Sequence, residues 1–199
     1  MNNTILNDLI KIFSKLPSLG PRSARRIVLY LLNNKDNVMS PLINSMDEAF
    51  NQIKHCPICG NLTTENICEI CSDETRNKDI ICIVENIADL WAIENTMIYK
   101  GQYHILGGTL SATEGRGPNE INIESLLEKI KNNKNIKEVI IATNPTIEGQ
   151  TTAFYIADIL KDFNLKITKP AYGIPLGSEF NYLDESTLDI AFKNKKEFQ

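Results

Sequence analysis

The chain has 199 residues and a mass of 22.4 kDa, a length that allows one compact domain or two small ones. Hydrophobic residues make up 42% and charged residues 23%, a balance that excludes a fibrous repeat and a wholly disordered chain. No apolar window of about 18 residues is present, and Asp8 stands where a signal peptide needs basic and apolar residues. We therefore expect a cytoplasmic protein with no membrane segment.

The net charge of −4 hides an uneven distribution along the chain. Residues 1–35 contain six basic residues and one acidic residue, a net charge of +5, which leaves −9 for the remainder. Such an asymmetry is typical of a protein that binds an anionic partner at one end. The charge pattern therefore points to the N-terminal region as the place where nucleic acid would bind.

Apolar residues at helical spacing predict helices through the first fifty-odd residues. One helix lies before the break at residues 17–21, and a second follows that break. A third is predicted to start with Ser40 as its N-cap and Pro41 at its first position. We expect this third helix to bury Leu42, Ile43, Met46, Phe50 and Ile53.

The turn between the first two helices favours a phosphate ligand. Gly20 permits close approach to the backbone, and the free N–H groups of the following helix point toward that place. Arg22, Arg25 and Arg26 add positive charge within about one turn. The alternative is a simple pair of helices in which the glycine only makes the turn and the arginines form a solvated face.

This segment resembles the helix-hairpin-helix motif. Gly20 and Ala24 match the motif, whereas Ser18 stands where its first glycine is common. Together with the local charge, the resemblance favours binding to DNA that is independent of base sequence and sensitive to salt.

Four cysteines follow in a stretch without apolar periodicity. Cys56, Cys59, Cys68 and Cys71 form two C-x2-C pairs separated by eight residues, a spacing that suits a tetrahedral zinc ion. With all four positions filled by protein, the ion would be structural, one per chain. An iron–sulfur cluster and a redox pair are the alternatives, and His55 is a lesser candidate as a ligand. Cys82 lies in an apolar strand and is expected to be a core residue.

From residue 79 onward, short apolar runs alternate with helical patterns, which predicts a mainly parallel sheet covered by helices. The expected strands are 80–84, 103–106, 139–143 and 165–168, and the expected helices are 89–95, 123–132 and 151–163. Ligand sites in such sheets lie at the carboxyl ends of strands, where Glu85 and Glu148 stand. These two acids are candidates to hold Mg²⁺, or are solvated loop residues. His104 falls inside a strand, where we expect a packed side chain.

The α/β region resembles a Toprim domain, in which a glutamate after the first strand works with an Asp-x-Asp pair after a later strand. Glu85 matches the glutamate, but Asn144 and Thr146 occupy the places of the two aspartates. Most of the metal-binding charge is therefore missing, and we do not expect strand cleavage.

The order of modules resembles the RecR family of recombination mediators over nearly the whole chain. The most specific stretches are residues 68–73, 89–94, 103–108, 115–118, 142–149 and 173–177, and Asn-Pro-Thr in place of Asp-x-Asp is itself a mark of that family. The resemblance implies a helix-hairpin-helix region at 1–54, a four-cysteine zinc finger at 55–78, a Toprim domain at 79–170 and a C-terminal segment at 171–199. The expected fold is therefore a mixture of α+β and α/β.

The resemblance also implies a DNA-binding protein without enzymatic activity that forms dimers or ring-shaped tetramers. With RecO, and RecF as a further partner, such a protein helps RecA replace single-strand-binding protein on gapped DNA. Arg22 and Arg26 would face DNA, and Glu85 and Glu148 would lie on the partner surface of the Toprim domain. The alternatives are a Mg²⁺-dependent Toprim nuclease or primase, and a zinc-stapled interaction module without a role in nucleic-acid binding.

Overall fold

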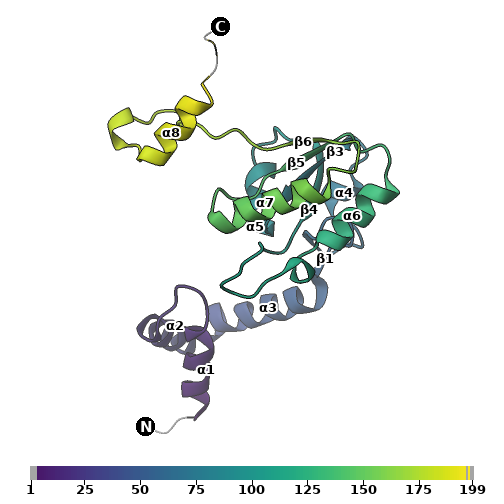
Figure 1. The fold of residues 1–199 in the computed structure, drawn as a ribbon. Coiled ribbons are helices and arrows are strands. Elements are labelled where there is room, and N and C mark those ends of the chain that lie inside the picture. The colour runs from purple at the N-terminus through teal and green to yellow at the C-terminus, as the bar shows by residue number, and fades with distance from the viewer. Residues whose placement is uncertain (1–3, 196, 198–199) are drawn as a thin grey trace. The chain divides into compact units, whose positions relative to one another are not determined.

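The structure is a computed structural model that describes residues 4–195 and 197 (Figure 1). The chain divides into two compact units, with the boundary between Lys54 and His55. Among the described residues, no helix combines the length and the apolar character needed to cross a membrane.

The first unit is helical. Its elements are α1 (Thr4–Ser14), α2 (Pro21–Asn33), the π-helical turn η1 (Lys35–Met39) and α3 (Ser40–Gln52). Helices α1 and α2 pack against each other, and Ala24, Val28 and Leu31 of α2 are buried among the residues that the structure describes in this unit. Gly20 is the N-cap of α2, and Pro21 occupies the first turn, where its missing N–H is not needed.

Helix α3 corrects two predictions. Its apolar side chains are exposed, Phe50 by 87% and Met46 by 63%, so this face is not buried within the chain as we expected. Ser40 is not an N-cap, because it has helical φ and ψ angles of −64° and −49° and continues directly from η1. The periodicity identified an apolar face, but a sequence pattern does not tell what covers such a face.

The second unit begins with the cysteine-rich region. Its elements are the paired strands β1 (Lys54–His55) and β2 (Leu62–Thr63) and the short helix α4 (Glu69–Ser72). These elements are too small to enclose an apolar core of their own, and the cysteines instead join the core of the neighbouring sheet.

A four-stranded parallel sheet with strand order β4-β3-β5-β6 forms the centre of the second unit, as predicted. Its strands are β3 (Asn77–Val84), β4 (Gly101–Ile105), β5 (Glu138–Ile141) and β6 (Lys166–Thr168). The helices are α5 (Ile87–Glu94), α6 (Ile123–Asn132), α7 (Ile147–Ile159) and α8 (Glu185–Lys193), with the 3₁₀ turns η2 (Pro118–Glu120) and η3 (Phe180–Tyr182).

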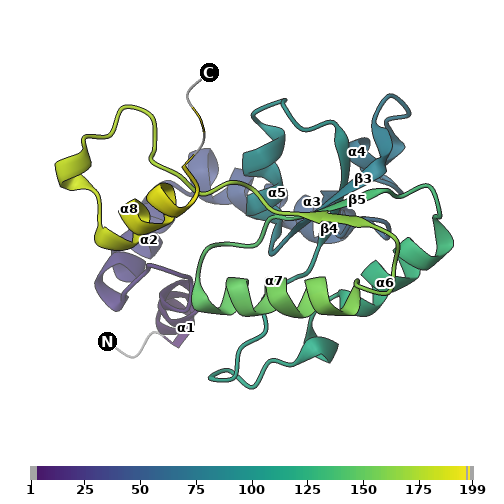
Figure 2. The ribbon, with the colours of Figure 1, turned by 45° about the horizontal axis from the view of Figure 1, so that its top comes forward.

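The two faces of this sheet pack against different elements, as Figure 2 shows for α5 on one side and α6 and α7 on the other. Side chains alternate along β3, so Ile81 and Ile83 join the core formed with α6 and α7. Cys82 and Val84 point to the opposite face and pack with α5 and with three of the four clustered cysteines. Cys82 is therefore a core residue, as expected. The cysteine-rich region lies on the α5 face of the sheet.

His104 on β4 is 3% exposed, and its Nε2–H donates to the carbonyl oxygen of Asn122 at 2.7 Å. Burial lowers the pKa of its imidazole to about 4. The unfolded chain therefore takes up this proton first, and stability that is present above about pH 6.5 is lost as the pH falls toward 4.

We expect the free energy of unfolding to fall by up to about 3 kcal/mol from this group over that interval. His104→Asn should remove that part of the slope, which urea unfolding of both proteins at a series of pH values would measure. Any loss of metal at low pH is common to both proteins. Equal slopes would show that His104 is not the titrating group.

Candidate metal centre and nucleic-acid interface

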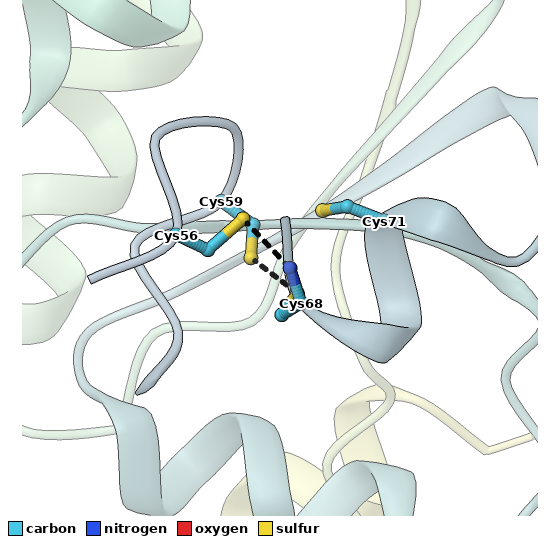
Figure 3. Close-up of side chains that lie close together, drawn as sticks. All are labelled: Cys56, Cys59, Cys68 and Cys71. Carbon is cyan, nitrogen blue, oxygen red and sulfur yellow. Dashed lines mark hydrogen bonds between the residues drawn. The ribbon is translucent and has the colours of Figure 1, made fainter. Parts of the chain in front are cut away.

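The four predicted cysteines lie together (Figure 3). Cys56 and Cys59 come from the loop between β1 and β2, whereas Cys68 precedes α4 and Cys71 lies within it. Cys56, Cys59 and Cys68 are buried and Cys71 is partly exposed. The two C-x2-C turns therefore approach each other from separate elements, with their sulfurs in one cluster.

The spacing of the sulfurs fits a metal ion. All four Sγ atoms lie within 4.8 Å of one another, and those of Cys59 and Cys68 are 3.5 Å apart. Zinc with four thiolates at about 2.3 Å in a tetrahedron requires sulfurs about 3.8 Å apart. No disulfide joins these residues. Backbone N–H groups also point at the sulfurs, from Asn61 to Cys59 at 3.4 Å and from Cys68 to Cys56 at 3.5 Å.

Three cysteines of this cluster have shifted pKa values. Hydrogen bonds, the largest from Cys71, lower the pKa of Cys59 to about 5. Burial raises the pKa of Cys68 to about 11, and the neighbouring Cys59 raises the pKa of Cys71. Cys59 therefore loses its proton more readily than Cys68 and Cys71, and a bound dication would favour the thiolate form of these neighbours. His55 is exposed and its Nδ1–H donates to the carbonyl oxygen of Gly60 at 3.0 Å, outside the sulfur cluster.

The cysteine-rich region is bonded directly to the sheet and to α5. The backbone N–H of Ile105 on β4 donates to the carbonyl oxygen of Cys59 at 2.9 Å. Trp91 on α5 donates from its indole Nε1–H to Asn61 Oδ1 at 3.0 Å. The cysteine cluster and the sheet therefore share one core and one set of hydrogen bonds.

A buried arginine adds a third connection, at the end of the cysteine-rich region. The side chain of Arg76 is 7% exposed, pairs with Glu94 on α5 and donates to the carbonyl oxygen of Gly101 at 3.0 Å. Removing either partner of a buried pair leaves an uncompensated charge, which destabilises a fold strongly. This pair therefore holds the entry of β3 against α5 and β4.

The predicted DNA-contacting residues lie together at the start of α2. Arg22, Arg25 and Arg26 are exposed. Arg25 and Arg26 follow Arg22 by three and four positions, which places them on the same side of the helix as Arg22. None of them forms an ion pair with a carboxylate among the described residues. Their charges therefore stay available to an external anion.

The turn before these arginines is open. Gly20 supplies no side-chain cap, and a Cβ built there would meet no atom within 4 Å, so the first amides of α2 are uncapped by a side chain. Ser18 has a φ of 62°, the left-handed region that glycine adopts without strain. This conformation explains why the motif commonly has glycine at the position of Ser18.

The predicted Toprim acid Glu85 follows β3 and is 9% exposed. Its Oε1 accepts from the backbone N–H of Asn144 at 2.7 Å, and its Oε2 accepts from Asn144 Nδ2 at 2.8 Å. The side-chain Nδ2 of Asn144 also donates to Asp89 Oδ2 at 3.3 Å. The residue in place of the first aspartate is thus a hydrogen-bond donor to both oxygens of Glu85 and supplies no carboxylate for a metal ion.

The residue in place of the second aspartate also has a structural role. Thr146 is the N-cap of α7, and its Oγ1 accepts from the backbone N–H of Gly149 at 3.0 Å. A Cβ at Gly149 would lie 2.1 Å from the carbonyl oxygen of Asn144 and 2.6 Å from Glu85 Oε1, so only glycine fits there. Glu148 lies in the first turn of α7 and is exposed. Glu85 therefore contacts the loop that leads into α7, close to the first turn that carries Glu148.

The sequence did not predict that the carboxylate of Asp89 accepts from the side chain of Asn144. Asp89 lies in the first turn of α5, where Asn86 is the N-cap and accepts from the backbone N–H of Asp89 at 3.0 Å. The available signal was an Asn three residues before an Asp at the start of a helix. This pattern indicates a helix cap, but it does not reveal that the Asp side chain contacts Asn144.

Comparison with known families covers nearly the whole chain. Residues 6–50 match the family described as RecR, helix-hairpin-helix, and residues 53–73 match the RecR zinc finger domain with four cysteine ligands. Residues 79–171 match the Toprim domain family, and residues 173–196 match RecR, C-terminal.

Whole proteins show the same similarity. Recombination protein RecR of Rickettsia massiliae (strain Mtu5) is 52% identical over 202 residues, which cover 100% of both chains. Its namesake in Rickettsia bellii (strain OSU 85-389) is 51% identical over 198 residues, covering 100% of this chain and 98% of the relative. Recombination protein RecR of Ehrlichia chaffeensis (strain ATCC CRL-10679 / Arkansas) is 48% identical over 190 residues, which cover 96% of this chain and 97% of the relative.

Proposed function

The chain belongs to the RecR family of recombination proteins, and from this membership we propose that it is a DNA-binding recombination mediator. With RecO, and RecF as a further partner, it helps RecA replace single-strand-binding protein on gapped DNA. The observation that carries the proposal is the pairing of an open, basic helix start with a Toprim domain in which Asn144 replaces an aspartate and donates to Glu85.

DNA binds at the turn between α1 and α2 in this proposal. The backbone N–H groups in the first turn of α2, after Pro21, donate to a phosphate at the positive end of the helix, and Arg22, Arg25 and Arg26 neutralise neighbouring phosphates. Contacts of this kind hold the sugar–phosphate backbone without reading base edges. Binding is therefore independent of base sequence.

The Toprim domain organises the complex and breaks no bond. Phosphoryl transfer with Mg²⁺ needs several free oxygen ligands around the ion. Here both oxygens of Glu85 accept from Asn144, and Thr146 caps α7. Glu148 instead offers an exposed carboxylate to a protein partner, and Glu85 positions the loop beside it.

One zinc ion per chain is held by Cys56, Cys59, Cys68 and Cys71 in this proposal. The sulfur separations and the N–H groups directed at the sulfurs support a tetrathiolate site with no open position. When bound, the ion supplies structural stabilisation and no chemistry on a substrate. We place the zinc region at 55–78, between a DNA-binding region at 1–54 and the Toprim domain at 79–170, with a C-terminal segment at 171–199.

The chain forms a dimer or a ring-shaped tetramer in this proposal. Exposed apolar side chains support it, because surfaces of this kind are typical of protein interfaces. On α3 they include Ile43, Met46 and Phe50. In the C-terminal segment they include Leu176, Phe180 and Tyr182. Measuring the mass by light scattering, with and without DNA, determines the assembly.

Formation of RecA filaments on gapped DNA coated with single-strand-binding protein tests the proposed function. We expect this chain, added with RecO, to shorten the delay before filaments form, and to leave supercoiled plasmid intact with Mg²⁺. The control is RecO alone at the same concentration. An unchanged delay would contradict the mediator role, and nicking that Glu85→Gln abolishes would show a nuclease.

A further inference from the structure

A lysine of the Toprim domain is partly buried and has no carboxylate partner among the described residues. Lys129 lies on α6, and its Nζ donates to the carbonyl oxygen of Tyr103 on β4 at 3.1 Å. Within the part of the chain that the structure describes, no Asp or Glu oxygen lies within 4 Å of this ammonium. Burying a cation is costly unless negative charge lies near it. Negative charge from another group would offset the partial loss of hydration of Lys129.

The outer edge of β4 brings Lys129 next to the cysteine cluster. Successive peptide groups of a strand point to opposite sides, so the Tyr103 carbonyl and the Ile105 amide share one side. The first accepts from Lys129, and the second donates to the carbonyl oxygen of Cys59 at 2.9 Å. The ammonium and the first cysteine knuckle are therefore neighbours along the same edge.

The packing on the adjacent face agrees with this placement. Tyr103 is fully buried in the cluster that contains Cys56, Cys59 and Cys68. Burial lowers the pKa of Lys129, and the sulfurs of all four cysteines act against burial and raise it. When the four cysteines are thiolates, as in a zinc site, their sulfurs supply negative charge near this ammonium, whereas burial lowers the pKa of the nearby His104 to about 4.

We infer that Lys129 is the counter-cation of the zinc–tetrathiolate centre and couples zinc binding to the packing of the Toprim domain. The inference rests on the zinc site of the proposed function. Zinc with four thiolates carries a net charge of −2, and a fixed ammonium beside it offsets part of this charge. The lysine positions the centre electrostatically and is not a ligand.

Zinc affinity measured by competition with a chromogenic chelator tests this role. Lys129→Met removes the charge and the hydrogen bond, and we expect zinc affinity to fall about tenfold or more, as for other outer-shell partners of a metal. Lys129→Arg keeps the charge and should stay close to wild type. Lys131→Met is the matched control, because Lys131 is on the same helix but exposed.

A second measurement separates charge from packing. Lys129→Gln keeps a hydrogen-bond donor without the charge, and its loss of thermal stability should be larger with zinc bound than after zinc removal. Equal losses in both states, or unchanged zinc affinity in Lys129→Met and Lys129→Gln, would overturn the inference. A wild-type protein that binds no zinc at all would instead refute the metal site of the proposed function.

Discussion

Replacing Cys68 by alanine is expected to abolish zinc binding and to unfold the cysteine-rich region before the rest of the chain. Zinc contributes on the order of 10 to 16 kcal/mol of apparent binding free energy in finger peptides, comparable to the roughly 5 to 15 kcal/mol that stabilises a whole domain. Strands β1 and β2 and helix α4 enclose no core that could replace this contribution. Elemental analysis for zinc and thermal unfolding measure the two effects.

We expect Cys68→Ala to destabilise the structure outside the cysteine-rich region as well. Cys59 accepts from Ile105 of the sheet, and Asn61 accepts from Trp91 of α5, so both bonds are lost when the knuckles separate. We therefore expect the melting temperature of the Toprim domain to fall as well. Hydrogen exchange should show increased opening along β4 and α5.

Cys82→Ala is the matched control for this experiment. Cys82 is as buried as Cys56, Cys59 and Cys68 but lies outside the sulfur cluster, and burial raises the pKa of its thiol to about 12. The variant should keep one zinc per chain and lose only about 1 kcal/mol, the cost of a small core deletion. A folded Cys68→Ala protein with full zinc content would contradict the assignment of the four ligands.

The double variant Arg22→Ala with Arg26→Ala is expected to weaken DNA binding roughly 10- to 100-fold for every sequence tested. Each arginine that contacts a phosphate releases a counterion, so removing two should reduce the slope of log affinity against log salt by about 1.8 on duplex DNA. Fluorescence anisotropy with unrelated oligonucleotides over a range of salt concentrations measures both quantities.

Removing two positive charges elsewhere tests whether the position of the charge matters. Lys131→Ala with Lys134→Ala changes the net charge equally, and both side chains are exposed at the end of α6 and the turn after it. This variant should bind DNA nearly as well as the wild type. Equal losses in the two double variants would mean that overall charge, and not the hairpin, sets the affinity.

Local patterns predicted most of the architecture. Two C-x2-C pairs within sixteen residues predicted the sulfur cluster, because each pair closes its own turn whatever surrounds it. The four short apolar runs predicted the parallel strands β3 to β6, because a strand buried on both faces is apolar along its length. The helix predicted from 151 begins earlier, at Ile147, because Thr146 acts as its cap.

Patterns of the same kind failed where a partner lies far away in the chain. The apolar residues of α3 follow helical periodicity whether the face is buried or open, so the expectation of burial was wrong. Asn144 contacts a glutamate 59 positions earlier, and Lys129 contacts a strand 26 positions earlier. No spacing in the sequence connects these residues.

The amino-acid sequence alone determined which elements form, where the sulfurs gather and where positive charge accumulates, since backbone periodicity and short-range spacing govern all three. Tertiary structure decided which groups Glu85 and the partly buried Lys129 contact. The order β4-β3-β5-β6 puts Asn144 against Glu85 at the strand ends and leaves the edge of β4 to Cys59 and Lys129. These outcomes depend on which strands are neighbours, and strand order arises only when the whole domain packs.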